Sequence, residues 1–312
     1  MTTTEETTRY RVGYAFEPKK VTTFIVTSFV DLANQNGIDL VPIEPTKPLI
    51  EQGPFHCVIH KLYGQQWKQQ LIEFTSKYPN AVIIDPPEKI EPLHNRLTML
   101  DSVTRINISQ PKTSVGIPKQ KVVEDGETIE ELGLKYPVIA KPLLANGGTT
   151  SHEMWVVLNS KGFESVKDQT PLLVQEYVNH GEVVFKVYVV GDHVECVKRR
   201  SLADIHITEE EDGEWSGVSI LPFSQISNAA TVEHESAKVD DAEMPPPKLV
   251  AELGRELRKA LGLRLFNFDV IRESEGKYAV IDINYFPGFA KLPHFEQIFT
   301  DFLLDQCKSK CN

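Results

Sequence analysis

The chain has 312 residues, of which 41% are hydrophobic and 25% charged. This is the composition of an ordinary globular protein of roughly two domains at about 150 residues each, which excludes a disordered or fibrous chain. Lys and Arg number 33 against 44 Asp and Glu, a net charge of −11. Because such a field repels nucleic acid and anionic membranes, we expect neither as a partner. A polyanionic ligand would need a local cluster of basic side chains.

The sequence carries no signal for export, membrane insertion or a disulfide framework. The N-terminus has no basic segment followed by an apolar one, and no later stretch approaches the roughly 20 apolar residues of a membrane span. The four cysteines lack paired spacing, which argues against both disulfides and a zinc site. We expect a cytoplasmic protein, with the nucleus as the other compartment, and a monomer because no long apolar seam or heptad is visible.

The first 95 residues alternate short apolar runs with helical stretches. Strands are predicted at residues 11–16, 40–43, 57–61 and 81–85, and helices at 65–78 and before Gly37. This alternation is typical of an open α/β domain with a largely parallel sheet. Pro86-Pro87 then breaks the chain, and one helix is expected over residues 88–103 with Arg96 on one face.

From residue 114 the pattern changes to longer runs of β-branched residues. Strands are predicted at residues 137–143, 153–158, 172–178, 183–190 and 194–199, with a helix at 160–167. Several of these adjoin directly, as antiparallel strands do. Two acidic stretches, 209–213 and 236–247, read as surface loops. Leucines recur every four residues from Leu249 to Leu261, which predicts an amphipathic helix that ends at Gly262.

Two alternating strand patterns, 265–272 and 277–284, flank a short turn and predict a hairpin. With Glu275-Gly276 as a two-residue loop, Asp269 directly faces Asp282 and Asn284 shares their face. The other face then carries Phe268, Val270, Ile281 and Ile283. Opposed like charges are destabilising, so a cation is expected between them. Two carboxylates and an amide oxygen suit Mg²⁺ completed by substrate phosphates. The alternative is a set of solvated polar positions on an outer face.

Basic side chains recur where strands end. Lys19-Lys20 and His60-Lys61 stand at the ends of N-terminal strands, a common place for ligand contacts in open α/β sheets. Lys141 closes a β-branched strand and either snorkels from the sheet or points at an anion. His152 is a surface or core residue, or a pH-sensitive donor to phosphate. Further basic residues that complete the cluster are Lys186, Arg199 and Lys291, the last just beyond a turn at Pro287-Gly288.

Two groups of motifs resemble known families. Lys141-Pro142, Gln175-Glu176-Tyr177, Phe268-Asp269-Val270 and residues 281–284 resemble the ATP-grasp superfamily. Val12-Gly13-Tyr14 with Lys19-Lys20, residues 59–62, Asn95-Arg96, residues 151–154, Phe185-Lys186-Val187 and residues 282–288 are similar to the inositol 1,3,4-trisphosphate 5/6-kinase family, also called inositol-tetrakisphosphate 1-kinase. The resemblance runs from about residue 11 to about residue 302. Residues 288–291 and the loop after Lys141 are nearest its plant-type branch.

The resemblance implies an α/β (α+β) ATP-grasp fold in three domains. These are an N-terminal open α/β domain (1–95) that binds inositol phosphate, and a central domain (96–178) and a C-terminal domain (179–312) with mixed or antiparallel sheets that sandwich the nucleotide. The residues implied to contact ATP are Arg96, Lys141, Arg199, Ser201 and the adenine-reading hinge Gln175, Glu176 and Tyr177. Those implied to hold Mg²⁺, as two ions, are Asp269, Asp282 and Asn284. Those implied to bind inositol phosphate are Lys20, Lys61, His152, Lys186, Asn284, Gly288 and Lys291.

We therefore expect an ATP- and Mg²⁺-dependent inositol polyphosphate kinase. Its acceptor would be inositol 1,3,4-trisphosphate at the 5 or 6 position, inositol 3,4,5,6-tetrakisphosphate at the 1 position, or inositol hexakisphosphate with a pyrophosphate product. No general base is assigned, because phosphoryl transfer needs positioning and charge neutralisation more than covalent help. Two alternatives stay open: an ATP-grasp carboxylate-amine ligase, and an inositol-phosphate binder without turnover. The lysines around the expected acceptor argue against the first, and the intact Asp, Asp and Asn set against the second.

Overall fold

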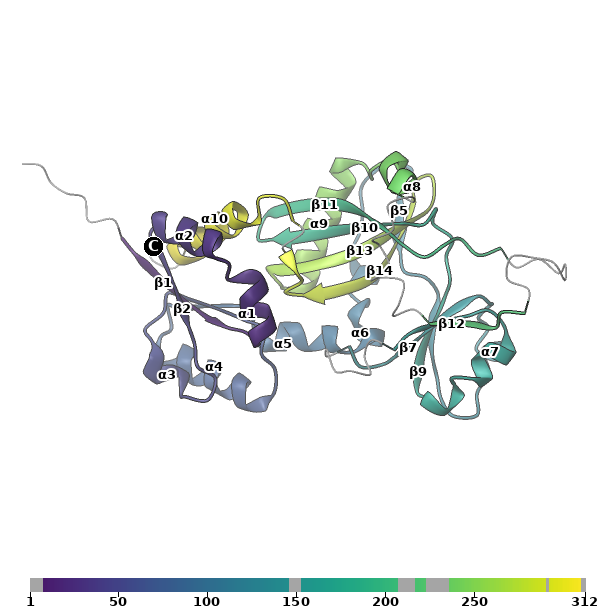
Figure 1. The fold of residues 1–312 in the computed structure, drawn as a ribbon, viewed down its shortest axis with the longest axis horizontal. Helices are drawn as coiled ribbons and strands as arrows, with labels where there is room; N and C mark the ends of the chain where they lie inside the picture. The colour runs from purple at the N-terminus through teal and green to yellow at the C-terminus, as the bar shows by residue number, and fades with distance from the viewer. Residues whose placement is uncertain (1–7, 146–152, 207–216, 223–235, 290–291, 310–312) are drawn as a thin grey trace, which may run out of the picture.

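A computed structural model describes residues 8–145, 153–206, 217–222, 236–289 and 292–309. Their strands form three sheets, which Figure 1 shows as an N-terminal part on the left, a central part, and a third part at the lower right. No helix in these ranges is long and apolar enough to cross a membrane. The mixture of helices and sheets confirms the expected α/β class.

The N-terminal sheet has four parallel strands, which confirms the predicted open α/β unit. Their order is β2 (Ile38–Pro42), β1 (Tyr10–Ala15), β3 (Cys57–His60) and β4 (Val82–Ile84). Its helices are α1 (Pro18–Phe24), α2 (Thr27–Gln35), α3 (Leu49–Gln52) and α4 (Gln65–Lys77). All four residues of β3 are buried, as expected where helices cover both faces of a parallel sheet.

The central sheet has five strands, and one of its faces carries Lys186, Asp269 and Asp282. Their order is β11 (His193–Arg200), β10 (Val183–Val190), β13 (Leu265–Ser274), β14 (Lys277–Tyr285) and β5 (Ser114–Gly116), all antiparallel except β5. Helix α9 (Pro247–Leu261) packs on the opposite face and ends at Gly262, as the sequence predicted. Gly262 has a left-handed φ of 68°. Gly254 permits this contact, because a Cβ there would lie 2.8 Å from Val194.

The third sheet is antiparallel and has its own core. Its order is β12 (Ile220–Pro222), β8 (Trp155–Val157), β7 (Val138–Pro142), β9 (Leu172–Glu176) and β6 (Gln120–Val123), with α7 (Ser160–Glu164) beside it. Strands β5, β6 and β12 were not predicted; they are three or four residues long and are defined by their partners. Strand β5 belongs to the predicted central domain (96–178) but joins the central sheet, whose other strands come from the predicted C-terminal domain (179–312). Strand β12 belongs to the predicted C-terminal domain but joins the third sheet.

The single helix expected over residues 88–103 is wrong. The segment is α5 (Pro87–Ile90), a 3-10 turn Glu91–His94, α6 (Arg96–Met99) and a 3-10 turn Val103–Arg105. Pro92 lacks the N–H that a continuous helix needs. Asn95 is extended (φ −120°, ψ 123°), bridges to Leu144, and caps α6 by accepting the Leu97 N–H. The break brings Arg96 to the start of α6.

Two further expectations need correction. The stretch 236–247, predicted as a loop, contains helix α8 (Ser236–Asp241), while residues 209–213 lie outside the described ranges. The hairpin pairing of Asp269 with Asp282 is confirmed, but a bulge follows it and places Val270 opposite Val280. Ile281 is the extra residue of this bulge, and it lines a cavity instead of facing the core.

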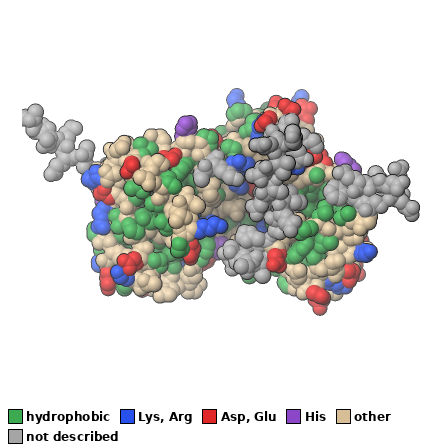
Figure 2. All heavy atoms as spheres, in the orientation of Figure 1, with side chains coloured by type: hydrophobic (Ala, Val, Ile, Leu, Met, Phe, Trp, Pro, Cys, Tyr) green, Lys and Arg blue, Asp and Glu red, His purple; other side chains and the backbone are tan. Residues whose placement is uncertain are grey.

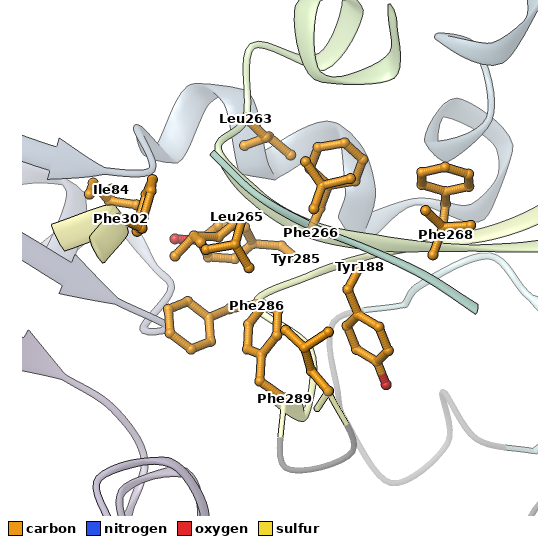
Figure 3. Close-up of a cluster of buried hydrophobic side chains, with 14 of the residues drawn as sticks. Ile84, Tyr188, Leu263, Leu265, Phe266, Phe268, Tyr285, Phe286, Phe289 and Phe302 are labelled. Atoms are coloured by element: carbon orange, nitrogen blue, oxygen red, sulfur yellow. The ribbon is translucent and has the colours of Figure 1, made fainter. Parts of the chain in front are cut away.

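One hydrophobic core joins the N-terminal sheet to the central sheet. Phe24 of α1 lies 5.0 Å from Phe286 and 4.8 Å from Phe299 of α10 (Phe295–Lys308), measured between ring centroids. Figure 3 shows Phe286 and Phe289 packed side by side near Tyr188. The core of the third sheet forms a separate cluster, with Val138, Leu172 and Val174 among its residues.

A buried polar network reinforces the same junction. The Tyr285 hydroxyl accepts a hydrogen bond from the Asp85 N–H (2.7 Å) and donates one to the His60 carbonyl (3.0 Å). Asp85 Oδ2 accepts the N–H groups of Arg264 (2.9 Å) and Leu265 (3.0 Å). The end of β14 is therefore tied to β3 and to the residue that follows β4.

Phe299→Ala should lower the free energy of unfolding by about 3–5 kcal/mol, because it leaves a cavity among aromatic rings at a fully buried position. Urea denaturation followed by tryptophan fluorescence measures the change. Ile72→Ala is the control: Ile72 is 51% exposed, and a shift of less than about 0.5 kcal/mol is expected. Equal losses in the two variants would contradict this account of the core.

Candidate functional site

A cavity of about 1030 Å³ opens between the three sheets. All three sheets contribute to its lining: Lys61 follows β3, Lys141 lies on β7, and Asp282 lies on β14. Figure 2 shows the surface hollowed between the left and right parts of the molecule, with Lys and Arg side chains beside the hollow. The cavity therefore lies where residues distant in sequence meet.

Two carboxylates that line the cavity face each other and are flanked by cations. Asp269 pairs with Asp282 across the hairpin, as the sequence predicted. Lys186 Nζ donates to both Asp269 oxygens at 2.9 and 3.2 Å, and Arg96 Nη1 lies 3.9 Å from Asp282 Oδ1. Asn284 Nδ2 donates to Asp282 Oδ2 at 2.5 Å. Positive groups thus offset the repulsion that the pairing would otherwise cause.

Burial and the neighbouring charges act in opposite directions on the pKa of Lys186, and the Lys186 ammonium opposes the effect of burial on the pKa of Asp269. Burial raises the pKa of Asp269; the Lys186 ammonium counteracts this, and the Asp282 carboxylate adds to it. Burial lowers the pKa of Lys186, but the two carboxylates outweigh burial and the net shift is upward. The lysine is therefore held in its charged form against Asp269.

Lys141 projects from the third sheet into the cavity and is only 7% exposed. Its Nζ donates to Gln175 Oε1 at 2.8 Å, and Gln175 Nε2 donates to Gln120 Oε1 at 2.9 Å. Burial, together with the nearby Arg96 charge, lowers the pKa of Lys141 to about 8. The buried Gln175 side chain thus orients the lysine, a contact that the sequence analysis did not anticipate.

The segment after β9 forms one wall of the cavity. The backbone N–H groups of Glu176 and Tyr177 pair with the carbonyls of Lys119 and Pro137. The Tyr177 hydroxyl donates to the Ala203 carbonyl at 2.6 Å. These hydrogen bonds, all accepted by main-chain carbonyls, hold the wall in place.

His180, which the sequence analysis missed, also lines the cavity. Its Nε2 lies 2.7 Å from Ser201 Oγ, and its Nδ1 lies 2.6 Å from the Val178 carbonyl oxygen. Burial lowers the pKa of His180, so the ring is neutral at physiological pH. The only feature of the local sequence that pointed to His180 is that it follows Tyr177 by three residues.

Two lysines converge on one carbonyl at the other end of the cavity. Lys61 Nζ donates to the Phe286 carbonyl at 3.2 Å, and Lys20 Nζ lies 3.4 Å from the same oxygen and 2.5 Å from the Pro287 carbonyl oxygen. Phe286 has a left-handed φ of 41°, which re-aims the chain after β14. Lys20 also lies 4.4 Å from the Phe286 ring centroid, a cation–π contact. Burial and the neighbouring Lys61 lower the pKa of Lys20 to about 7.

Most of the predicted site residues line this one cavity. They are Lys20, Lys61, Arg96, Lys141, Gln175, Glu176, Tyr177, Lys186, Ser201, Asp269, Asp282, Asn284 and Gly288. Arg199 lies opposite Val184 on the same face as Lys186, but it is not one of the described residues that line the cavity. His152 and Lys291 lie outside the described residues.

The chemistry of the central donor set suits a hard cation that ligands complete. Asp269, Asp282 and Asn284 offer carboxylate and amide oxygens, which Mg²⁺ prefers. Within the described ranges, no cluster of three or more His, Cys, Asp or Glu side chains is arranged to hold a metal. A divalent ion here would need oxygens from a second molecule, as substrate phosphates provide.

The fold is that of ATP-grasp enzymes. D-alanine–D-alanine ligase from Bacillus anthracis, solved with ATP, superposes with a TM-score of 0.62 over 97% of this chain and 98% of the ligase at 13% identity. An ATP-grasp RimK domain protein from Sphaerobacter thermophilus gives a TM-score of 0.60 over 94% of this chain and 99% of that protein at 15% identity. These identities show the shared fold alone.

Sequence comparison then identifies the family. Residues 11–90 match the inositol 1,3,4-trisphosphate 5/6-kinase pre-ATP-grasp domain, and residues 109–305 match the ATP-grasp domain of the same kinase. The chain is 54% identical to inositol-tetrakisphosphate 1-kinase 2 of Glycine max over 310 residues, 97% of this chain and 96% of that protein. It is 47% identical to inositol-tetrakisphosphate 1-kinase 1 of Arabidopsis thaliana over 315 residues, 97% of each chain. The chain belongs to the inositol 1,3,4-trisphosphate 5/6-kinase family, whose enzyme class is the ATP-dependent inositol phosphate kinase, as the sequence motifs predicted.

Lys186→Met should destabilise the protein by about 1–3 kcal/mol, because it leaves the Asp269 carboxylate without its ammonium partner. The side chains are 24% and 20% exposed, so the cost should stay below the about 3–5 kcal/mol of a fully buried pair. Denaturant unfolding in metal-free buffer measures the loss. Adding Asp269→Asn should recover most of it, and a double variant no more stable than Lys186→Met would contradict the pairing energy.

Proposed function

We propose that this protein transfers the γ-phosphate of ATP to a hydroxyl of an inositol polyphosphate, with Mg²⁺ at Asp269, Asp282 and Asn284. The observation that supports this most is that one cavity is lined by two sets of groups. We assign the facing carboxylates and Lys141 to a nucleotide end, and Lys20 and Lys61, which meet at the Phe286 carbonyl, to an acceptor end. Our proposal includes three working units at residues 1–95, 96–178 and 179–312, acting as a monomer in the cytoplasm or nucleus.

The residues fit Mg²⁺ because the facing carboxylates already need positive charge, which Lys186 and Arg96 supply in part. We propose two ions, each completed by phosphate oxygens of the nucleotide. When bound, Mg²⁺ would neutralise phosphate oxygens and hold the nucleotide in line for transfer.

The nucleotide end is formed by residues from the central and third sheets. Lys141 presents its buried ammonium to the phosphates, and Gln175 keeps it aimed. Arg96 adds a second charge beside Asp282. We assign the adenine-reading wall to Gln175, Glu176 and Tyr177, with Ser201 lining the same pocket and Arg199 as a further nucleotide contact. These charges stabilise phosphate oxygens without a proton transfer.

The acceptor end is formed by basic side chains that orient the inositol ring. Lys20 and Lys61 bind its phosphates, and Lys186, which contacts Asp269, lines the same cavity. We assign His152, Asn284, Gly288 and Lys291 to the same end. The acceptors that we propose are inositol 1,3,4-trisphosphate, inositol 3,4,5,6-tetrakisphosphate and inositol hexakisphosphate. A ligase would need space for two smaller substrates, and three lysines favour a polyanion instead.

The function is tested by incubating the protein with Mg²⁺-ATP and inositol phosphates from trisphosphate to hexakisphosphate, and resolving the products by anion-exchange chromatography. We expect a product one phosphate richer than its acceptor. Asp282→Ala should abolish the product while nucleotide-free protein stays folded by circular dichroism, because it removes one metal carboxylate. Binding of an acceptor without product would instead indicate a silent binder.

The affinity for inositol phosphate should fall as pH rises above 7. The pKa of Lys20 is about 7 in the ligand-free protein, so above that pH the side chain must take up a proton to bind an anion. Between pH 7 and 8.5, the dissociation constant of the wild type should rise about tenfold more than that of Lys20→Arg, which stays charged.

Isothermal titration calorimetry in two buffers of different ionisation enthalpy measures both affinity and proton uptake. The titration of the ligand's own phosphates is common to both proteins and cancels in the comparison. Identical pH profiles would show that Lys20 is already charged before the ligand binds.

A further inference from the structure

Asn267 is fully buried on the face of the central sheet that carries Asp269. Of its two polar side-chain groups, only the NH₂ group has a hydrogen-bond partner among the described residues. Asn267 lies on β13, and its exposed fraction is 0%. Its Nδ2 donates to Asp269 Oδ1 at 3.0 Å. Its Oδ1 makes no hydrogen bond to any described residue. A buried amide oxygen without a partner is destabilising, so its presence here calls for an explanation.

The orientation of this amide is fixed by its neighbour. A carboxylate accepts hydrogen bonds and cannot donate one, so only the NH₂ end of Asn267 can face Asp269. The carbonyl end must therefore point away from Asp269. The same reasoning applies to Asn284, whose NH₂ end faces the Asp282 carboxylate. The orientation of both side-chain amides is therefore fixed, with the NH₂ group toward the carboxylate.

Strand register brings these two amides to opposed positions. Asn267 pairs with Asn284, just as Asp269 pairs with Asp282 two residues along. Both pairs are on the same face of the hairpin, since alternate residues of a strand share a face. Directly opposed residues have Cβ atoms about 4.5–5.5 Å apart, within reach of a hydrogen bond between two asparagine side chains.

We propose that Asn267 is a positioning residue that orients two of the metal ligands at once, Asp269 through its NH₂ group and Asn284 through its carbonyl oxygen. In the ligand-free protein, the Asn284 NH₂ group rests on Asp282, so its carbonyl oxygen is turned from that carboxylate. When Asp282 turns to a cation, the Asn284 NH₂ group needs another acceptor. The unused Asn267 oxygen is the acceptor directly opposite, and bonding there presents the Asn284 oxygen to the same cation as the carboxylates.

This inference rests on the proposed function, because it assumes that Asp269, Asp282 and Asn284 hold a divalent cation. It adds a residue that contacts neither the substrates nor the metal. Partners of this kind typically change metal affinity by about 10–100-fold when they are removed. A merely structural asparagine would change stability and leave metal affinity unaltered.

The test measures Mn²⁺ binding by electron paramagnetic resonance of the full chain with a non-hydrolysable ATP analogue, so it does not depend on turnover. Asn267→Leu keeps the side-chain size and removes both polar contacts. We expect its Mn²⁺ dissociation constant to rise at least about tenfold. In an Asn284→Ala background the same substitution should have a smaller effect, because one of the two ligands that it positions is gone.

Phe268→Leu is the matched control. Phe268 is equally buried and adjacent in sequence but is on the opposite face of β13, so its substitution should lower the melting temperature and leave Mn²⁺ affinity unchanged. If leucine prevents folding, Asn267→Ser is used, and the same loss of Mn²⁺ affinity is expected.

The outcomes separate this inference from the proposed function. If Asp282→Ala loses Mn²⁺ while Asn267→Leu binds it within twofold of the wild type, Asn267 is not a positioning residue and the metal site stands. A loss of affinity in Phe268→Leu equal to that in Asn267→Leu would also overturn the inference. If Asp282→Ala and the wild type bind Mn²⁺ alike, the metal assignment itself fails, and the inference falls with it.

Discussion

The site depends on two carboxylates that face each other across one hairpin. Paired strands hold Asp269 and Asp282 at directly opposed positions, where their charges repel. Lys186 and Arg96 provide the compensating charge when no ligand is present. Neither partner is local: Lys186 comes from the adjacent strand β10, and Arg96 from a short helix far earlier in the chain. Strand β10 and helix α6, which lie beside the hairpin at the cavity, bring these two cations to it.

In the function that we propose, Lys20 and Lys61 would let a protein with a net charge of −11 bind an anion. Lys20 and Lys61 are held by main-chain carbonyls of Phe286 and Pro287. Their ammonium groups are already largely removed from water, and part of the desolvation cost of binding is met during folding. The carbonyls are neutral dipoles, so a phosphate competes with them more easily than it would with a carboxylate.

The sequence predicted the elements that are defined locally. The hairpin and its central register follow from a two-residue turn and alternating side chains, and the end of α9 follows from Gly262. The break at Asn95 was missed because it depends on a bridge to Leu144, almost 50 residues away. The bulge at Ile281 also escaped, because an extra residue in one strand leaves no mark on the alternating pattern.

The candidate site was predictable in part for the same reason. Motif resemblance selected Lys141 and Gln175 separately, but their mutual hydrogen bond depends on the pairing of β7 with β9. His180 and Asn267 carry no distinctive motif. Their positions become meaningful only when the neighbouring Ser201 and Asp269 are placed beside them. The sequence motifs therefore identified candidate site residues better than they identified the residues to which these are hydrogen-bonded.

The core that joins the N-terminal and central sheets is separate from the hydrophobic clusters of the third sheet, and this separation has a mechanical consequence. The N-terminal and central sheets share one continuous core and the Tyr285 network, whereas the third sheet encloses its own. Separating the N-terminal sheet from the central sheet would pull packed phenylalanines apart, whereas displacing the third sheet would leave its own core intact. If nucleotide and inositol phosphate bind as we propose, product nucleotide would leave by displacement of the third sheet, and the inositol phosphate pocket would keep its shape.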